Sequence, residues 1–285
     1  MNFGVTGANG YVGSVMTRYL RKEGHTVYEF KRKSDSSHDP YWVPYHLSSD
    51  VRETFLKKLD GLIHCAYDFS AASWDKIYRI NVEGSCNLFK TAVRAGVKKI
   101  VFISSMSAFP NAKSMYGKAK LAIEDYASQK GFTTIRPGLV YGSKPGGMVG
   151  SLIKTINKSQ FIPLIGGGKQ IFYLSHEEDL FKLVIESITR NPTPSQIITA
   201  AHDQGISFKE ILELLARSRN KKISFISIPW QPIFLALKSA ELLGFPINFR
   251  SDSLISFLNQ NPKPDFTHTR QSGISFRPFC LETLR

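Results

Sequence analysis

Short apolar runs alternate with longer segments of helical periodicity over the first two thirds of the chain. The runs have the length and the β-branched or aromatic content of buried strands, and they lie at residues 2–6, 25–31, 61–66, 99–104 and 132–136. The segments between them place apolar residues three or four positions apart, as amphipathic helices do, at 11–23, 51–59, 75–95 and 116–129. Strands that alternate with helices predict an α/β fold with a doubly wound parallel sheet and right-handed crossovers.

The pattern changes after about residue 141. Glycine and proline become frequent, and the helical segments at 178–189 and 208–219 alternate with short strand-like runs at 196–200 and 222–228. We interpret this part as a smaller C-terminal α/β lobe that binds the substrate. The expected domains are 1–165, which holds the main sheet, and 166–285, the substrate-binding lobe, interleaved with the end of that sheet.

A glycine-rich turn joins the first strand to the first helix. Gly7 permits a tight turn, Gly10 lets the backbone approach a pyrophosphate, and Gly13 lets the helix pack closely on the sheet. The N-terminus of the following helix offers free N–H groups and a partial positive charge to an anion. This context predicts a Rossmann-type dinucleotide site. The other residues of the turn expected to line it are Asn9, Tyr11 and Val12.

Two basic residues, Lys31 and Arg32, stand at the end of the second strand. NAD enzymes usually have an acidic residue here, which binds the ribose hydroxyls. Cations attract a 2′-phosphate instead, and arginine can bind it with two hydrogen bonds. We therefore expect NADP(H) in preference to NAD(H). If Lys31 takes the place of the acidic residue, strand alternation is expected to point the nearby Glu29 away. A solvated basic loop is the alternative.

Tyr116 and Lys120 stand four residues apart at the start of a predicted helix, so they share one face. An ammonium group lowers the pKa of a nearby tyrosine from about 10 and suits it for proton transfer. The spacing is common on any helix and gains meaning from the glycine turn upstream. With its GxxGxxG turn, the chain resembles the extended branch of the short-chain dehydrogenase/reductase superfamily, which includes nucleotide-sugar epimerases, dehydratases and reductases.

The resemblance covers about residues 1–185 and implies roles for individual residues. It implies that Tyr116 is the acid/base, that Lys120 tunes it and binds the nicotinamide ribose, and that Ser105, four residues before Phe109, holds the substrate oxygen. Further motifs that match the family lie at 62–66, 81–84, 136–142 and 173–180. From them the resemblance implies that the cofactor also contacts Cys65, Ala66, Pro137, Leu139 and Val140.

Three departures from the family pattern bear on the reaction. Sugar 4,6-dehydratases follow their catalytic threonine with Asp-Glu, whereas this chain has Met106 and Ser107, so we do not expect a dehydratase. His46 stands where an aspartate often contacts the adenine. Tyr67 replaces a small residue and is expected to narrow the site near the nicotinamide.

The favoured function is that of an NADP(H)-dependent keto-sugar reductase or epimerase acting on a nucleotide-activated sugar, with reduction slightly preferred. Arg217 and Arg250 are candidates to hold the substrate diphosphate. Two alternatives stay open. One is a reductase of a non-sugar ketone or alcohol, and the other is a catalytically silent NADP-binding regulatory subunit, against which the retained Tyr116, Lys120 and Ser105 argue.

Composition narrows the setting. The three cysteines, Cys65, Cys86 and Cys280, fit no disulfide framework or zinc spacing, which favours a cytoplasmic enzyme without a metal. The start does not read as a signal peptide, and no apolar run reaches the ~18 residues of a transmembrane helix. The net charge of +14 suits an anionic small molecule, but no block of like charge or RNA-binding motif indicates a nucleic acid partner. A homodimer through the long helices is a further expectation.

Residues 229–249 are apolar and helix-prone. The simpler interpretation is that they belong to the core of the lobe. The alternative is a surface that faces a membrane or a lipid-linked substrate.

Overall fold

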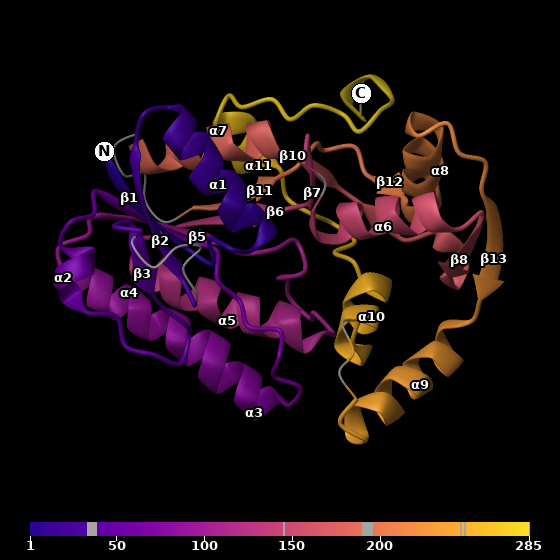
Figure 1. Ribbon diagram of the computed structural model, residues 1–285, viewed down its shortest axis with the longest axis horizontal. Helices are drawn as coiled ribbons and strands as arrows, with labels where there is room; N and C mark the ends of the chain where they lie inside the picture. Colours follow the sequence, from indigo (N-terminus) through magenta and orange to yellow (C-terminus); the bar gives the residue numbers. More distant parts are fainter. Residues whose placement is uncertain (33–38, 145, 190–195, 246, 248, 285) are drawn as a thin grey trace.

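A parallel sheet forms the centre of the computed structural model, which describes residues 1–32, 39–144, 146–189, 196–245, 247 and 249–284. Within these residues its strand order is β11-β6-β5-β4-β1-β2-β3, and every neighbouring pair is parallel. The expected Rossmann-type sheet is thus confirmed (Figure 1). The strands are β1 (Asn2–Thr6), β2 (Thr26–Lys31), β3 (Trp42–Pro44), β4 (Gly61–His64), β5 (Lys99–Ile103), β6 (Thr133–Pro137) and β11 (Ile197–Ala200).

The strand order reverses at β1. Successive strands run outward from it in one direction through β2 and β3, and in the other through β4, β5 and β6. Thr6 at the end of β1 is in register with Phe30 on β2 and His64 on β4. The loops after these strands therefore meet at one point, which is where doubly wound sheets bind their ligands.

Helices cover both faces of the sheet (Figure 1). Along the strands, Leu62 faces one layer and its neighbour Ile63 the other, so each strand is apolar on both sides. One layer consists of α1 (Tyr11–Lys22), α7 (Glu177–Thr189) and α11 (Thr267–Gln271). The other consists of α2 (Glu53–Leu56), α3 (Trp74–Ile77), the π-helical turn η1 (Tyr78–Glu83), α4 (Gly84–Arg94) and α5 (Met115–Gln129).

The expected C-terminal α/β lobe is also present. Its core brings together Ile153, Phe172, Ile211 and Phe257. Its strands are β7 (Leu139–Tyr141), β8 (Phe161–Ile165), β9 (Ile171–Phe172), β10 (Leu174–His176), β12 (Ile206–Ser207) and β13 (Ser224–Ile228). Its helices are α6 (Gly147–Lys158), α8 (Phe208–Ser218), α9 (Trp230–Leu242), α10 (Ser251–Leu258) and the short turns η2 (Gly166–Gly168) and η3 (Glu282–Leu284).

The chain passes between the two parts more than once. α6 and β8 precede residue 165 and supply Ile153 and Ile162 to the core of the lobe. α7 then packs on α1, and β11 pairs with β6 in the main sheet. The boundary between 165 and 166 stays a prediction.

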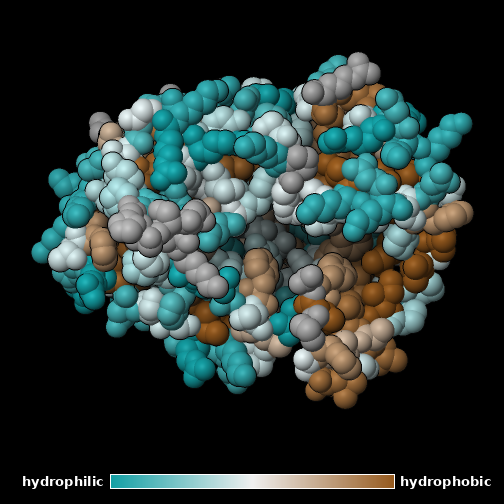
Figure 2. Space-filling model, viewed as in Figure 1, coloured by the Kyte–Doolittle hydropathy of each residue, from teal (hydrophilic) through white to brown (hydrophobic). Residues whose placement is uncertain are grey.

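The interpretation of residues 229–249 as lobe core is wrong. None of the described residues of this segment is buried, and Leu235 and Leu242 of α9 are 67% and 79% exposed. The segment is the brown, hydrophobic region at the lower right of Figure 2. No helix in the described part of the chain is long and apolar enough to cross a membrane.

Candidate active site

The glycine-rich turn lies at the carboxyl ends of β1 and β4. Gly7 has a φ of +65°, and a Cβ atom there would lie 2.9 Å from the backbone of Ala66. A Cβ atom at Gly13 would lie 2.2 Å from the carbonyl oxygen of Gly7. The N–H of Gly10, the N-cap of α1, donates to that same oxygen at 2.8 Å. The missing side chains leave a cradle at the helix N-terminus that fits a pyrophosphate.

A cavity of about 710 Å³ extends from this turn to Tyr116. His46 and Tyr67, two of the departures from the family pattern, also line it. The residues present therefore fit a dinucleotide, with the glycine cradle in the middle and basic residues toward one end. All residues that the sequence nominated for the cofactor line this cavity: Gly7, Asn9, Gly10, Tyr11, Val12, Gly13, Lys31, Arg32, Cys65, Ala66, Tyr116, Lys120, Pro137, Leu139 and Val140.

The basic end of β2 differs from the expectation. The buried Lys31 forms an ion pair with Glu29, with 2.7 Å between Nζ and Oε2, and Arg21 pairs with the same carboxylate at 2.7 Å. The expectation that strand alternation points Glu29 away is wrong, because side chains two positions apart lie on the same side of a strand. Arg32 is exposed and lines the cavity.

A buried hydrogen-bond chain holds the backbone of Cys65 and Ala66 against the cavity. Thr6 Oγ1 accepts their two N–H groups at 3.1 and 3.2 Å and lies 2.7 Å from Nδ1 of His64. The hydroxyl therefore donates its own proton to His64, whose Nε2 lies 2.9 Å from Ser85 Oγ. Burial lowers the pKa of His64 to about 3, so the ring is neutral. It connects Thr6 to Ser85 through its two nitrogen atoms.

Asn81, in η1, positions the loop that covers Tyr116. Its Oδ1 accepts the N–H of Asp68 at 2.7 Å and its Nδ2 donates to the Asp68 carbonyl at 3.1 Å. The neighbours of Asp68 are Tyr67 and Phe69, whose ring centroids lie 4.8 and 5.6 Å from that of Tyr116. The motif at residues 81–84 thus acts on the site through the backbone of this loop.

Tyr116 and Ser105 lie where two cavities meet. Both residues line the cofactor cavity and also a second cavity of about 620 Å³. Burial raises the pKa of Tyr116, and a hydrogen bond with Ser105 opposes the rise. The expectation that Lys120 gives Tyr116 a lowered pKa is wrong for this structure, because the cost of burying the phenolate dominates.

Lys120 is fully enclosed beside them. Its Nζ donates to the carbonyl oxygen of Ile103 at 2.8 Å and lies 4.7 Å from the ring centroid of Phe102. Burial lowers the pKa of Lys120 to about 8, and the charges of Cys65 and Glu124 oppose this. The amine can therefore gain or lose a proton within the pH range in which enzymes work.

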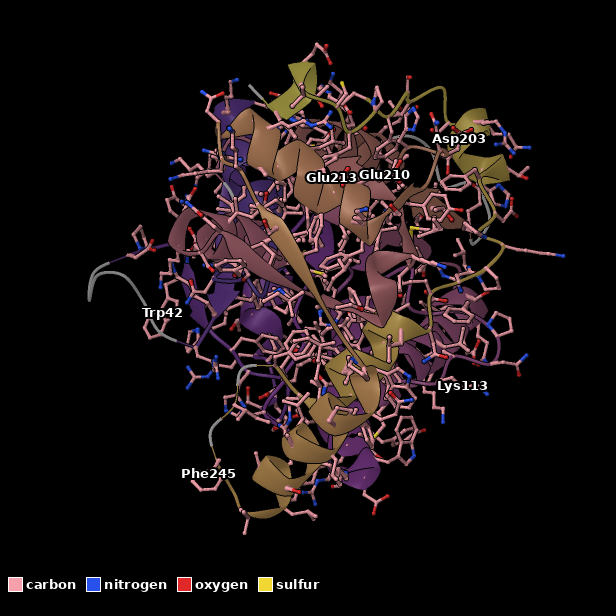
Figure 3. The ribbon with its side chains drawn as sticks, turned by 90° about the vertical axis from the view of Figure 1, so that its right-hand side faces the viewer. Trp42, Lys113, Asp203, Glu210, Glu213 and Phe245 are labelled. Carbon is pink, nitrogen blue, oxygen red and sulfur yellow. The ribbon has the colours of Figure 1, made fainter. Side chains whose placement is uncertain are left out.

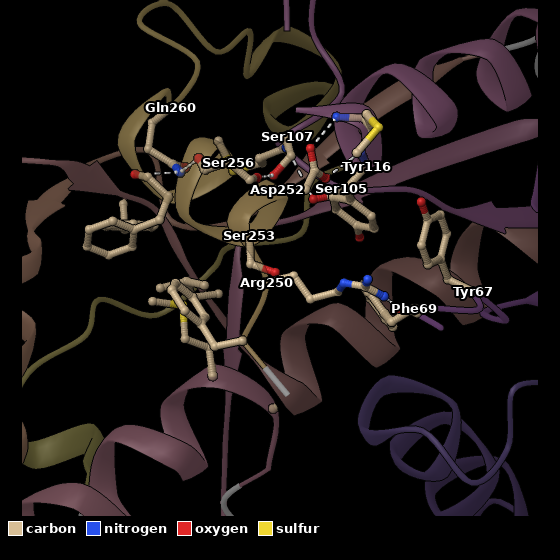
Figure 4. Close-up of a pocket in the computed structure, with 18 of the residues that line it drawn as sticks. Tyr67, Phe69, Ser105, Ser107, Tyr116, Arg250, Asp252, Ser253, Ser256 and Gln260 are labelled. Carbon is tan, nitrogen blue, oxygen red and sulfur yellow. Dashed lines mark hydrogen bonds between the residues drawn. The ribbon is translucent and has the colours of Figure 1, made fainter. Parts of the chain in front are cut away.

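The second cavity lies between the main sheet and α10 (Figure 4). Met106 and Ser107, where 4,6-dehydratases carry an acid pair, both line it. Neither side chain is a carboxylic acid, so elimination of water has no acid and base at these two positions. Other polar residues that line the cavity are Ser253, Ser256 and Gln260.

Asp252 is a residue of the site that the sequence did not single out. Its two carboxylate oxygens accept the backbone N–H groups of Met115 and Tyr116 at 2.7 and 3.0 Å. Ser114, the N-cap of α5, satisfies the next one, from Gly117, at 3.1 Å. A carboxylate from α10 of the lobe therefore completes the start of the helix that carries Tyr116.

Glu177, the first residue of α7, is a buried carboxylate near the cofactor cavity. It forms an ion pair with Arg18 at 2.8 Å and accepts the Ser143 hydroxyl at 2.9 Å. Tyr11 Oη lies 3.5 Å from it, and a Cβ atom at Gly146 would lie 2.3 Å from the Tyr11 ring. These contacts fix Tyr11 across the cavity from the strand ends.

The two arginines suggested for a substrate diphosphate lie apart. Arg250 lines the second cavity, where its guanidinium donates to the carbonyl oxygens of Phe69 and Ser70 at 3.3 and 2.9 Å. Arg217 is exposed on α8 and is not among the residues that line either cavity. Only Arg250 is placed to meet a substrate held at Tyr116.

A family model described as the NAD dependent epimerase/dehydratase family matches residues 4–199. The UDP-glucose 4-epimerase of Vibrio cholerae is 24% identical over 94% of this chain and 88% of its own length. An Escherichia coli O157:H7 protein, N-acetyl-alpha-D-glucosaminyl-diphospho-ditrans,octacis-undecaprenol 4-epimerase, is 22% identical over 79% of this chain and 74% of its own length. The match to an uncharacterized Sinorhizobium fredii protein, 25% identical over 84% of this chain, spans 66% of that protein.

The fold also matches solved structures. The structure of MoeE5 in complex with UDP-glucuronic acid and NAD superposes with a TM-score of 0.79 and 20% sequence identity. The match covers 100% of this chain and 96% of that chain. At this identity the likeness concerns the fold, including the C-terminal lobe.

Proposed function

This chain is an enzyme of the NAD dependent epimerase/dehydratase family, and we propose that, with NADP(H) as its cofactor, it reduces the carbonyl of a keto-sugar or epimerises a sugar at an alcohol carbon through a ketone intermediate. The observation that carries the proposal is the place of Tyr116 and Ser105. Both line the cofactor cavity and the second cavity, which we call the substrate cavity. A proton donor and a hydrogen-bond partner therefore stand where the two ligands would meet.

The bound nicotinamide would supply or accept a hydride. Tyr116 Oη holds the proton that leaves or joins the substrate oxygen, and the Ser105 hydroxyl orients that oxygen. Burial keeps Tyr116 protonated in the free enzyme, which suits it to give a proton to a carbonyl oxygen during reduction. The Lys120 ammonium supplies positive charge behind the tyrosine when the phenolate forms.

The preference for NADP(H) rests on the charges at the end of β2. Glu29 lies two residues before the end of this strand, and its carboxylate is held by Arg21 and Lys31. It is therefore engaged by cations instead of being presented to the ribose hydroxyls. The exposed guanidinium of Arg32 on the cavity wall supports a 2′-phosphate.

A nucleotide sugar is the first substrate we propose. The Vibrio cholerae relative is named for UDP-glucose, and the MoeE5 structure holds UDP-glucuronic acid. Arg250 lines the substrate cavity and could meet a diphosphate there. A sugar diphosphate on a lipid carrier, as in the name of the Escherichia coli relative, is the second candidate, favoured by the exposed apolar segment that leads to this cavity.

We place the enzyme in a reducing compartment, the cytoplasm, because Cys65, Cys86 and Cys280 are all free thiols.

The homodimer through the helices of residues 74–94 and 115–129 stays a prediction. Sedimentation velocity of the purified chain tests it.

Thermal-shift titration tests the proposed function directly. NADPH should raise the midpoint of unfolding more than NADH at equal concentration, and a nucleotide sugar should raise it further in the presence of NADP⁺. Product analysis by NMR then separates the two reactions, since reduction consumes NADPH and epimerisation leaves its concentration unchanged. Stabilisation by neither cofactor would overturn the proposal.

A further inference from the structure

An apolar surface extends over one end of the C-terminal lobe. It starts on the outer side of the β8/β13 ribbon and continues over α9 and the residues after it (Figures 2 and 3). Figure 3 shows β13 leading into α9, with Phe245 at the far end. We call this surface the docking face and define it by its exposed residues Phe161, Pro163, Ile226, Trp230, Leu235, Leu242, Leu243 and Phe245.

The register of the ribbon explains its outer side. Strand alternation turns Ile162 and Leu164 inward, to the core of the lobe, and leaves Phe161 and Pro163 outside. Ile226 is the partner of Pro163 across the ribbon and is 51% exposed. A solvent-facing strand would normally carry polar residues at these positions.

The exposed side of α9 is mainly apolar: Trp230, Pro232, Leu235, Ala236 and Leu242 are exposed there beside the polar residues Gln231, Lys238 and Ser239. Leu235 and Leu242 lie on its outer side, and the half-buried Phe234 and Leu237 lie on its inner side. The helix has two charged residues, Lys238 and Glu241. Glu241 accepts hydrogen bonds from Ser251, so Lys238 is the exposed charge among the described residues of the helix. A helix whose exposed side is mainly apolar is normally covered by protein or by lipid.

Exposed lysines stand next to the docking face. Lys158 lies three residues before Phe161, and Lys221 and Lys222 stand just before β13; all three are exposed. With Lys238 they place cations around an apolar centre in a chain whose net charge is +14. This combination of apolar insertion and basic flanks complements the surface of an anionic bilayer.

The docking face continues into the rim of the substrate cavity. Phe249, 43% exposed, lies four residues beyond Phe245 and lines that cavity. Glu241 of α9 lines it too, and pairs with Arg250 at 3.6 Å. One element therefore reaches from the apolar surface to the place where the proposed substrate meets Tyr116.

We propose that the docking face binds the surface of an anionic phospholipid bilayer, with α9 lying in the headgroup region and the substrate cavity opening beside it. A flat protein partner would cover one stripe of α9, whereas lipid chains can surround its outer and lateral sides at once. Trp230 and the phenylalanines suit the boundary between water and acyl chains. Docking is independent of the reaction, so it stands or falls apart from the proposed function.

Vesicle co-sedimentation of the full chain tests this. Wild-type protein should pellet with vesicles of phosphatidylglycerol and phosphatidylcholine, and less with phosphatidylcholine alone. The double variant Leu235→Gln, Leu242→Gln should lower the partition coefficient about tenfold or more, since two exposed apolar side chains lose their burial in lipid. Neither substitution alters charge, and both residues are solvent-exposed, so NADPH stabilisation should be unchanged.

The matched control is Tyr78→Gln, Val93→Gln, two exposed apolar residues on the opposite part of the molecule, which should pellet like the wild type. In a Trp42→Phe, Trp74→Phe background, brominated lipid should quench Trp230 fluorescence, which reports insertion even if pelleting is weak. Equal pelleting of both double variants would overturn the proposal. So would an absence of vesicle binding together with a dimer that Leu235→Gln, Leu242→Gln dissociates, since the face would then contact a second copy of the chain.

Discussion

The carboxylate of Asp252 accepts the backbone N–H of Tyr116 at 3.0 Å, across the boundary between the lobe and the main domain. The other oxygen accepts the N–H of Met115 at 2.7 Å. The first turn of α5, the helix that carries Tyr116, is therefore completed by a residue 136 positions away in the chain. Through this contact, the position of the lobe helps to fix the position of Tyr116.

Asp252→Ala should lower the free energy of unfolding by about 1–2 kcal/mol, because two N–H groups at a helix N-terminus lose their acceptor. It should also lower kcat/KM, since α10 and α5 then separate more easily. Asp125→Ala, an exposed carboxylate on the same helix, is the control and should change neither quantity. Urea denaturation and steady-state kinetics measure both. Unchanged kinetics in Asp252→Ala would show that the contact is structural alone.

Tyr116→Phe should reduce turnover by about 10²–10⁴-fold, because the ring stays and the transferable proton is lost. NADPH binding, followed by fluorescence titration, should change little. Tyr126→Phe, on the same helix but stacked on Phe89, should retain full activity. Loss of cofactor binding in Tyr116→Phe would instead assign the phenol a structural role.

Arg32→Ala should weaken NADPH by about 10–100-fold and NADH by much less, since a charge-assisted hydrogen bond is worth about 1.5–3 kcal/mol. Isothermal titration with both cofactors measures the ratio. Arg52→Ala removes another exposed arginine and should leave both affinities as they are. Equal weakening of NADPH and NADH would remove the support for a 2′-phosphate site.

Lys31→Met should act mainly on stability. The substitution removes a buried cation 2.7 Å from Glu29 and leaves that carboxylate with Arg21. A cost of about 2 kcal/mol in the free energy of unfolding is expected, below the full cost of an unpaired buried charge. A variant as stable as the wild type, but with selectivity moved to NADH, would return Lys31 to the role of a phosphate ligand.

The pH dependence of stability should report Lys120. Burial lowers its pKa from 10.5 to about 8, so between these values the unfolded chain binds more protons than the folded one. The contribution of Lys120 to the free energy of unfolding therefore rises as pH increases through this window, by about 3 kcal/mol at most. Subtracting the pH profile of Lys120→Met from that of the wild type isolates it. Lys118→Met, exposed on the same helix, should retain the rise, and a flat difference profile for Lys120 would contradict the prediction.

Local patterns in the sequence determined the main domain. The glycine turn, the apolar runs and the four-residue spacing of Tyr116 and Lys120 depend on neighbours in the chain. Local conformations of this kind can be recognised from the spacing of residue types in the sequence. The residues of the cofactor cavity follow, because parallel strands bring their ends to one edge. The same logic was less informative in the lobe, where the helix at 147–158 begins with a glycine and the strand at 161–165 contains Pro163.

Contacts between distant segments were decided by the tertiary structure alone. The pairing of Arg21 with Glu29, and the hydrogen bonds from Met115 and Tyr116 to Asp252, depend on which surfaces meet. The segment at 229–249 shows the reason most clearly, since an apolar helix has the same composition whether protein covers it or leaves it exposed. The sequence determined that α9 would be apolar, and only the packing of the lobe decided that its apolar side would face outward.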